Sequence, residues 1–164
     1  MIGEDAMYAF EISYIKAGWF EVKISLDSEE IIITNSDYLD NDAPAILLKN
    51  ISNLLENRTT EAWLCWQDEP GAFIWSLKNV DDTLFISISI AMKDSMQLNY
   101  EGETLRDEEV YKVIAEISIP LYTFAKEVYD AFYLYSSGEK LEQYEGGWMP
   151  FPADELSRLK KLLR

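Results

Sequence analysis

The sequence predicts an α+β fold with a mainly antiparallel sheet of about seven strands, formed by meanders of three and four strands. Two or three helices would pack on one face of this sheet. Two observations support this prediction: apolar and polar residues alternate in two separate blocks, and each block is followed by a segment with apolar residues at helical spacing. The length of 164 residues and the 48% hydrophobic content suit one folded domain spanning residues 1–164.

The first block, residues 8–33, predicts a three-stranded meander. Its apolar residues occupy every second position of each strand, as a half-buried strand requires. A three-residue loop ending in Gly18 would place Tyr14 opposite Phe20. A second turn would place Leu26 opposite Ile31, and the two turns agree on which residues face inward.

A first helix of about 13 residues is predicted to follow this meander. Asp42 can cap its N-terminus, and Pro44 is tolerated in its first turn. Leu47, Ile51 and Leu54 then recur on one helical face, which indicates that the helix covers a sheet.

The stretch WLCWQDEPGAFIW, residues 63–75, predicts a hairpin that begins a four-stranded meander. A four-residue loop puts Trp66 opposite Phe73, and the next turn, at 79–82, puts Trp75 opposite Ile86. Both turns assign Trp66 and Trp75 to the same apolar face. Residues 113–119 alternate in the same way and supply the fourth strand. The tryptophan cluster is therefore predicted to belong mainly to the core.

Trp63 lies on the opposite face of this meander. Its predicted neighbours there are Cys65, Ile74, Ser76, Phe85, Ser87, Ser89, Ile114 and Glu116. Such a mixed face is either partly covered by another segment or a surface patch that receives a partner, and we expect partial cover. Alternation alone allows one seven-stranded sheet or two sheets, and we expect one.

Pro120 is predicted to open a second helix that lasts to about residue 137. Tyr122, Tyr129 and Tyr133 form a line beside its apolar stripe, and tyrosines in such a place are either the rim of a core or interface residues. The buried stripe itself is predicted to contain Leu121, Phe124, Ala125, Val128, Phe132 and Tyr135.

The C-terminal part is predicted to contain a non-helical crossing and a last helix. Gly146, Gly147 and two prolines favour the crossing, which would bury Trp148 or Phe151, and Asp154 can cap the helix. The polar segment between residues 91 and 107 reads as a connection with room for a short edge strand.

The charge balance is strongly acidic. The chain has 30 acidic and 14 basic residues, a formal charge of −16, and four of the basic residues occupy the last seven positions. Positions 1–157 therefore carry ten basic against 30 acidic residues, a formal charge of −20. Such a field repels nucleic acid and anionic membranes and attracts cationic partners, although acidity also serves solubility alone.

The residue types present exclude much catalytic chemistry. Histidine is absent and Cys65 is the single cysteine, so the usual histidine-based triads, zinc sites and iron–sulfur clusters cannot be assembled. No phosphate-binding or dinucleotide motif occurs, and we expect no cofactor, no resident metal and no catalytic residue. Asp37, Asp40 and Asp42 could hold a hard cation, but they lack the pattern of a calcium loop and favour a solvated helix start.

In size, acidity and mixed order of strands and helices, the chain resembles the immunity proteins of bacterial polymorphic-toxin systems. Those proteins neutralise a co-produced toxin, often a basic nuclease, by occluding its active site. The resemblance is one of general character over the whole chain, without a family motif, so it assigns no residues. It implies a bacterial protein that binds a toxin, while the missing catalytic residue types predict a non-catalytic protein, the acidic charge a basic protein partner, and the default location is cytoplasmic. The lack of a signal segment and of an apolar run long enough to span a membrane agrees with that location.

Two alternatives stay open. The first is a small α+β domain that binds a small ligand or hydrolyses a substrate with carboxylates, and the second is a homo-oligomer that uses the mixed sheet face internally. If a partner binds, its predicted contacts are the acidic loop and the exposed aromatics. These residues are Asp37, Asp40, Asp42, Trp63, Tyr122, Tyr129 and Tyr133.

Overall fold

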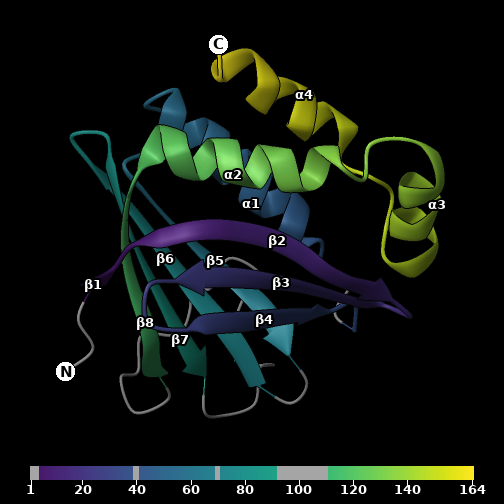
Figure 1. Cartoon of the computed structure of the whole chain (residues 1–164), viewed down its shortest axis with the longest axis horizontal. Coiled ribbons are helices and arrows are strands. Elements are labelled where there is room, and N and C mark those ends of the chain that lie inside the picture. The colour runs from purple at the N-terminus through teal and green to yellow at the C-terminus, as the bar shows by residue number, and fades with distance from the viewer. Residues whose placement is uncertain (1–3, 39–40, 69–70, 92–110) are drawn as a thin grey trace.

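The computed structural model describes residues 4–38, 41–68, 71–91 and 111–164. It has an α+β architecture with two sheets (Figure 1). The smaller sheet has the order β2-β3-β4 and is antiparallel, and the larger has the order β1-β8-β7-β6-β5. In the larger sheet only the two-residue strand β1 (Glu4–Asp5) pairs in parallel. The smaller sheet consists of β2 (Met7–Lys16), β3 (Trp19–Leu26) and β4 (Glu30–Ser36). The larger is completed by β5 (Glu61–Asp68), β6 (Gly71–Val80), β7 (Thr83–Ala91) and β8 (Tyr111–Pro120).

The single sheet that we expect from the alternation is wrong, because β4 and β5 are not joined by a backbone ladder. Side chains make the connection instead. The Asn35 amide oxygen accepts a hydrogen bond from the backbone N–H of Gln67 at 2.9 Å, and the Thr34 hydroxyl donates to the Asp68 carboxylate at 2.7 Å. The predicted meanders of three and four strands are therefore correct, but each forms a sheet of its own.

The described residues form four helices, where two or three are predicted. Helix α1 (Ala43–Leu55) follows β4 and contacts β5, with Asp42 as its N-cap and a proline in the first turn, as predicted. Helix α2 (Leu121–Tyr133) lies over β2 and also contacts β7 and β8 (Figure 1). The predicted helix to residue 137 ends early, and a separate helix α3 (Gly138–Gly147) follows it. Helix α4 (Ala153–Leu162) packs on α1 and α2.

The observed registers of the hairpins differ in part from those predicted from the alternation of apolar and polar residues. The β5–β6 pairing is confirmed, with Trp66 opposite Phe73. In β6–β7 the turn is two residues long, so Trp75 faces Ile88 and not Ile86. A shift of the strand register by two residues leaves the same side chains on the buried face. The alternation of apolar and polar residues therefore does not detect such a shift.

The β2–β3 hairpin differs from the prediction in a way that changes faces. Its loop has two residues, and β2 has a bulge between Ile12 and Tyr14. The extra residue reverses the alternation, so Ile15 pairs with Phe20 and is buried, while Tyr14 is exposed. In β3–β4, Ile24 and not Leu26 faces Ile31, again a slip of two.

Phe20 is the centre of the core. Its side chain is fully buried, and its ring lies 5.6–6.1 Å from the rings of the four aromatic residues around it. These are Trp66, Phe132, Tyr144 and Trp148, which come from β5, α2, α3 and the segment after α3. The predicted burial of Trp66, Trp75 and Trp148 is confirmed.

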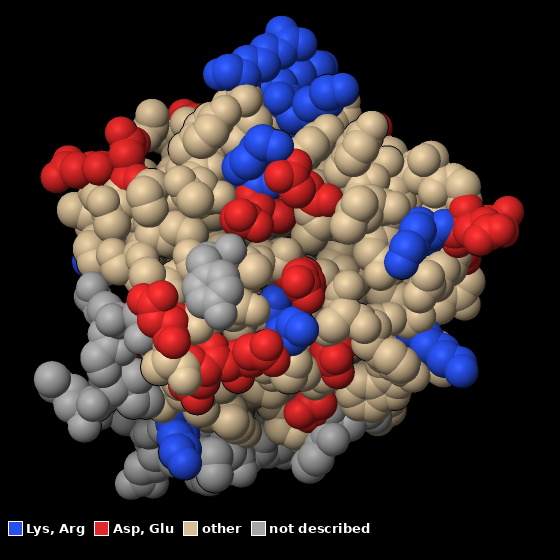
Figure 2. Space-filling view, in the orientation of Figure 1, with Lys and Arg blue, Asp and Glu red and all other residues tan. Residues whose placement is uncertain are grey.

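The basic C-terminal residues are gathered on α4, which forms one pole of the molecule (Figure 2). One of them has a structural role, because Arg158 donates to the Glu56 carboxylate at 3.0 Å and to the Asn53 side-chain oxygen at 2.7 Å. Hydrogen bonds from Arg158 and Arg58 lower the pKa of Glu56. These contacts fasten α4 to the end of α1. Within the residues described, no helix has the length and apolarity needed to cross a membrane.

We predict that replacing Asp81 by Asn and Asp82 by Gly raises the free energy of unfolding by about 1 kcal/mol. Both residues have positive φ, at 49° and 65°, in the two-residue turn between β6 and β7, where Asn-Gly is the favoured pair. A thermal melt should show a rise in Tm of about 2–4 °C. The control is Asp27→Asn in the β3–β4 turn, for which we expect no change, and an equal rise in both proteins would contradict the prediction.

Candidate functional site

Helix α2 forms an exposed ridge with its inner face on the core. Phe124, Val128 and Phe132 are among the buried residues of this face, and the opposite face of the helix is exposed at Tyr122, Lys126 and Tyr133. Leu134, the C-cap, has 67% of its surface exposed, and Tyr133 beside it has 57%. These are two of the most exposed large hydrophobic side chains in the described part of the chain.

A groove, which we call the tyrosine groove, runs between α2 and the C-terminal helices and has a volume of about 340 Å³. On the α2 side, the rings of Tyr129 and Tyr133 stack with their centroids 5.8 Å apart. Lys126 lies over the Tyr129 ring at 5.9 Å and pairs with Asp130 at 2.7 Å. The remaining lining comes from Ser136, Leu141, Glu145, Phe151, Ala153, Leu156, Ser157 and Lys160.

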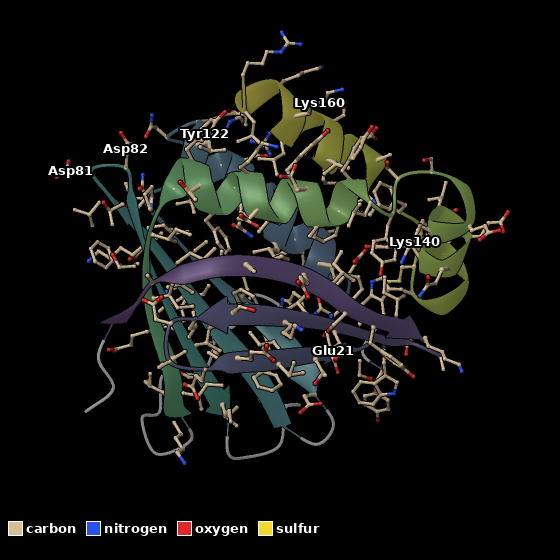
Figure 3. The ribbon with its side chains drawn as sticks, viewed as in Figure 1. Glu21, Asp81, Asp82, Tyr122, Lys140 and Lys160 are labelled. Carbon is tan, nitrogen blue, oxygen red and sulfur yellow. The ribbon has the colours of Figure 1, made fainter. Side chains whose placement is uncertain are left out.

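A second groove lies on the other side of α2, against β2, and has a volume of about 380 Å³. We call it the acidic groove, because three of its four charged lining residues are carboxylates. It is lined by Phe10, Glu11, Ile12, Glu127, Asp130, Ala131, Leu134, Tyr135 and Lys140. Lys140 reaches it from α3 and lies over the Tyr135 ring at 5.0 Å (Figure 3).

The three predicted tyrosines all lie on α2, and the structure brings two of them together. Tyr129 and Tyr133 form the stacked pair of the tyrosine groove. Tyr122 lies near the start of the helix, where its hydroxyl donates to the Leu163 carbonyl at 2.6 Å and holds the end of α4 (Figure 3). Tyr122 is therefore in part a packing residue, although its ring remains exposed.

Two of the three predicted aspartates are described by the structure, and both lie outside α2. Asp37 is exposed directly after β4, beside Gly18, while Asp40 falls outside the described residues. Asp42 is half-buried at the start of α1, where its carboxylate accepts hydrogen bonds from the Ala45 backbone and the Trp148 indole. Its geometry is that of a helix cap.

Trp63 lies on β5, on the outer face of the larger sheet, and is also separate from the α2 ridge. It is half-buried and packs against a small cluster that contains Cys65 and Ile74, both buried. Phe85 on the same face is 37% exposed. The outer face is thus partly covered, as we expect from the sequence. Among the described residues, no group of three or more acids and thiols is placed to hold a metal ion.

Comparisons with known proteins give one weak likeness. No family model matches the sequence, and no curated protein matches it. A solved chain from the CdiA-CT/CdiI toxin and immunity complex from Enterobacter cloacae superposes with a TM-score of 0.43 at 15% sequence identity. The match covers 80% of this chain and 98% of that chain. The chain therefore bears a weak resemblance to a component of a toxin and immunity complex.

We predict that Asp42→Asn stabilises the protein at pH 7 by up to about 1 kcal/mol. The change removes a charge that burial disfavours, and it keeps the helix cap because asparagine caps helices as well as aspartate does. Burial raises the pKa of Asp42, against the opposing effect of its hydrogen bonds to Trp148 and Ala45. A raised pKa means that protonation favours the folded state, so the stability from this group is present below about pH 4 and lost as the pH rises through the folded pKa.

Urea unfolding of both proteins at pH 4 and pH 7 tests this effect. The difference between Asp42→Asn and the unchanged protein should be larger at pH 7. A difference that is the same at both pH values would contradict it, and Asp42→Ala, which removes the acceptor, should be destabilised at both.

We also predict that Cys65 is inert in the folded protein. Burial raises the pKa of its thiol to about 12, so the reactive thiolate is scarce at neutral pH. A disulfide reagent at pH 8 should react about 100-fold or more slowly with the native protein than with the protein in urea. Rapid, stoichiometric reaction without urea would contradict the burial of this residue.

Sequence reasoning misses Leu134, Glu127 and Glu11, which come together only at the acidic groove. One signal for Leu134 is present in the sequence. It is a leucine that falls outside the buried stripe of α2 at helical spacing, and an apolar residue in that position is expected to face solvent. Glu127 and Glu11 carry no such signal, because acids on exposed faces are ordinary.

Proposed function

We propose that this protein is a non-catalytic binding protein that neutralises a basic partner, such as a nuclease toxin, in the manner of an immunity protein. The observation that carries the proposal is the formal charge of −16 on a chain that has no histidine. A field of this size and sign accelerates encounter with a cationic protein.

The arrangement of charge on the surface supports this proposal. Lysine and arginine are most concentrated on α4, while the face that contains α2 and β2 has acidic residues spread over it with single basic residues between them (Figure 2). A basic partner would therefore be steered away from α4 and toward the ridge. Exposed Tyr133 and Leu134 supply the side chains that would be desolvated in the contact.

No observation favours the alternative of a carboxylate-based hydrolase. Such a site needs acids buried around a cavity. The buried polar side chains of the described segments are Ser25, Asn35, Ser36, Asn41, Ser52 and Gln67, none of which is a carboxylic acid.

The test uses the product of the coding sequence that adjoins this one. Expressed alone, that product should arrest bacterial growth, and co-expression with this protein should restore it. The purified proteins should form a complex whose association rate falls at least about 10-fold between 50 and 500 mM salt. No rescue together with no complex, or a complex with an association rate independent of salt, would refute the proposal.

A further inference from the structure

The acidic groove combines apolar walls with carboxylates at its edge. Phe10, Ala131 and Tyr135 are buried residues in its lining, and Glu11, Glu127 and Asp130 supply the carboxylates. Its volume of about 380 Å³ is at the small end of the range for ligand pockets, which suits one or two inserted side chains.

The carboxylates are not equivalent. Asp130 is paired with Lys126 at 2.7 Å, and Glu11 with Lys23 at 3.5 Å. Glu127 is half-buried and takes part in none of the ion pairs found among the described residues. A partly desolvated carboxylate without a counter-ion attracts a cation more strongly than an exposed carboxylate does.

The groove already contains one cationic side chain, Lys140, which lies over the aromatic ring of Tyr135. The Lys140 ammonium is 5.0 Å from the centroid of Tyr135 and forms no ion pair that the described residues show. The Tyr135 ring, which is 6% exposed, thus already has a cation over one face, and a partner's cation would bind there by displacing Lys140. A guanidinium group could stack on such a ring and offer two parallel donors to a carboxylate.

One lining residue of the groove is both apolar and strongly exposed. Leu134 lines the groove and exposes 67% of its surface, and Tyr133 is its neighbour in the chain. Tyrosine is a typical energetic centre of protein interfaces, and Leu134 next to it offers apolar surface that a partner would bury.

We propose that the basic partner inserts an arginine or lysine side chain into the acidic groove against Glu127, with an apolar residue next to it on Leu134. This assignment rests on the proposed function and adds the chemistry of the contact. The acidic field brings the partner to this face, and the groove holds it there through one desolvated ion pair and one apolar contact.

The test compares Glu127→Gln with Glu29→Gln for binding to the product of the adjoining coding sequence, purified in an inactive form. Both changes remove one negative charge, but Glu29 is an exposed residue of the β3–β4 turn and does not line the groove. We expect Glu127→Gln to weaken binding at least about 10-fold through faster dissociation, and Glu29→Gln less than about 2-fold through slower association. Equal effects would overturn the groove assignment while leaving the proposed function in place.

A second measurement does not depend on Glu127. A photo-cross-linker is attached through Ser137→Cys or Tyr38→Cys, two exposed sites of which the first lies between the groove residues Leu134 and Lys140 in the chain, while buried Cys65 stays unlabelled. A covalent complex formed preferentially from position 137 supports the proposal, and equal or lower yield from position 137 overturns it. If the unchanged protein forms no complex, the proposed function fails and the groove assignment with it.

Discussion

Phe20→Ala is expected to lower the free energy of unfolding by about 3–5 kcal/mol. The Phe20 ring is fully buried and lies against aromatic rings from three other elements and the segment after α3. Its removal takes away the transfer free energy of the ring and leaves a cavity that rigid aromatic neighbours cannot fill. Since domains of this kind are stable by about 5–15 kcal/mol in total, a large part of the stability would be lost.

Urea unfolding followed by tryptophan fluorescence measures this effect, because Trp66 and Trp148 touch the ring that is removed. The matched control is Phe85→Ala on the outer face of the larger sheet, where the side chain is 37% exposed. We expect Phe85→Ala to lower the free energy of unfolding by about 1 kcal/mol or less. Similar losses in the two variants would show that Phe20 is not the centre of the core.

Asn35→Ala is expected to lower the free energy of unfolding by about 2–4 kcal/mol, although it removes only a small side chain. Asn35 is buried on β4, accepts a hydrogen bond from the Gln67 N–H at 2.9 Å and donates to the Asn41 carbonyl at 3.4 Å. The alanine variant leaves a buried donor and a buried acceptor unsatisfied. This loss falls where the two sheets meet, so it should also weaken their association.

The control for Asn35 is Asn50→Ala on α1. Among the described residues, the Asn50 amide donates to the Ile46 carbonyl alone, a helical backbone group four residues earlier, and the Asn50 side chain is half-buried. We expect this change to cost less than about 1 kcal/mol. Hydrogen exchange should show faster opening of β4 and β5 in Asn35→Ala alone, and equal exchange in both variants would contradict the role of Asn35 in joining the sheets.

Some elements are predictable because two local signals agree. Helix α1 has a cap at Asp42, a proline in its first turn and an apolar face, and it begins and ends as expected. The β5–β6 register is correct because the loop and the alternation on both sides point to one pairing. Helix α3 is missed because only Tyr144 is buried in it, so it has no apolar stripe to detect.

The candidate site is less predictable than the fold. The tyrosine line on α2 is visible in the sequence, since a helix places residues 129 and 133 side by side. The acidic groove is not visible, because Glu11 and Glu127 belong to β2 and α2 and are far apart in the chain. The predicted contacts Asp37, Asp42 and Trp63 lie on other elements, and their part in binding stays a prediction.

The charge, the absence of histidine chemistry, the α+β class and most of the buried residues follow from the amino-acid sequence alone. These are properties of composition and of local periodicity, which tell which side of each element faces inward. Two further features depend on how the elements pack. The meanders form two sheets joined through Asn35, and β2 and α2 enclose a groove lined by Glu127, which has no ion-pair partner among the described residues. The reason is physical: periodicity orients a side chain relative to its own element, whereas the partner that it meets depends on how distant elements pack.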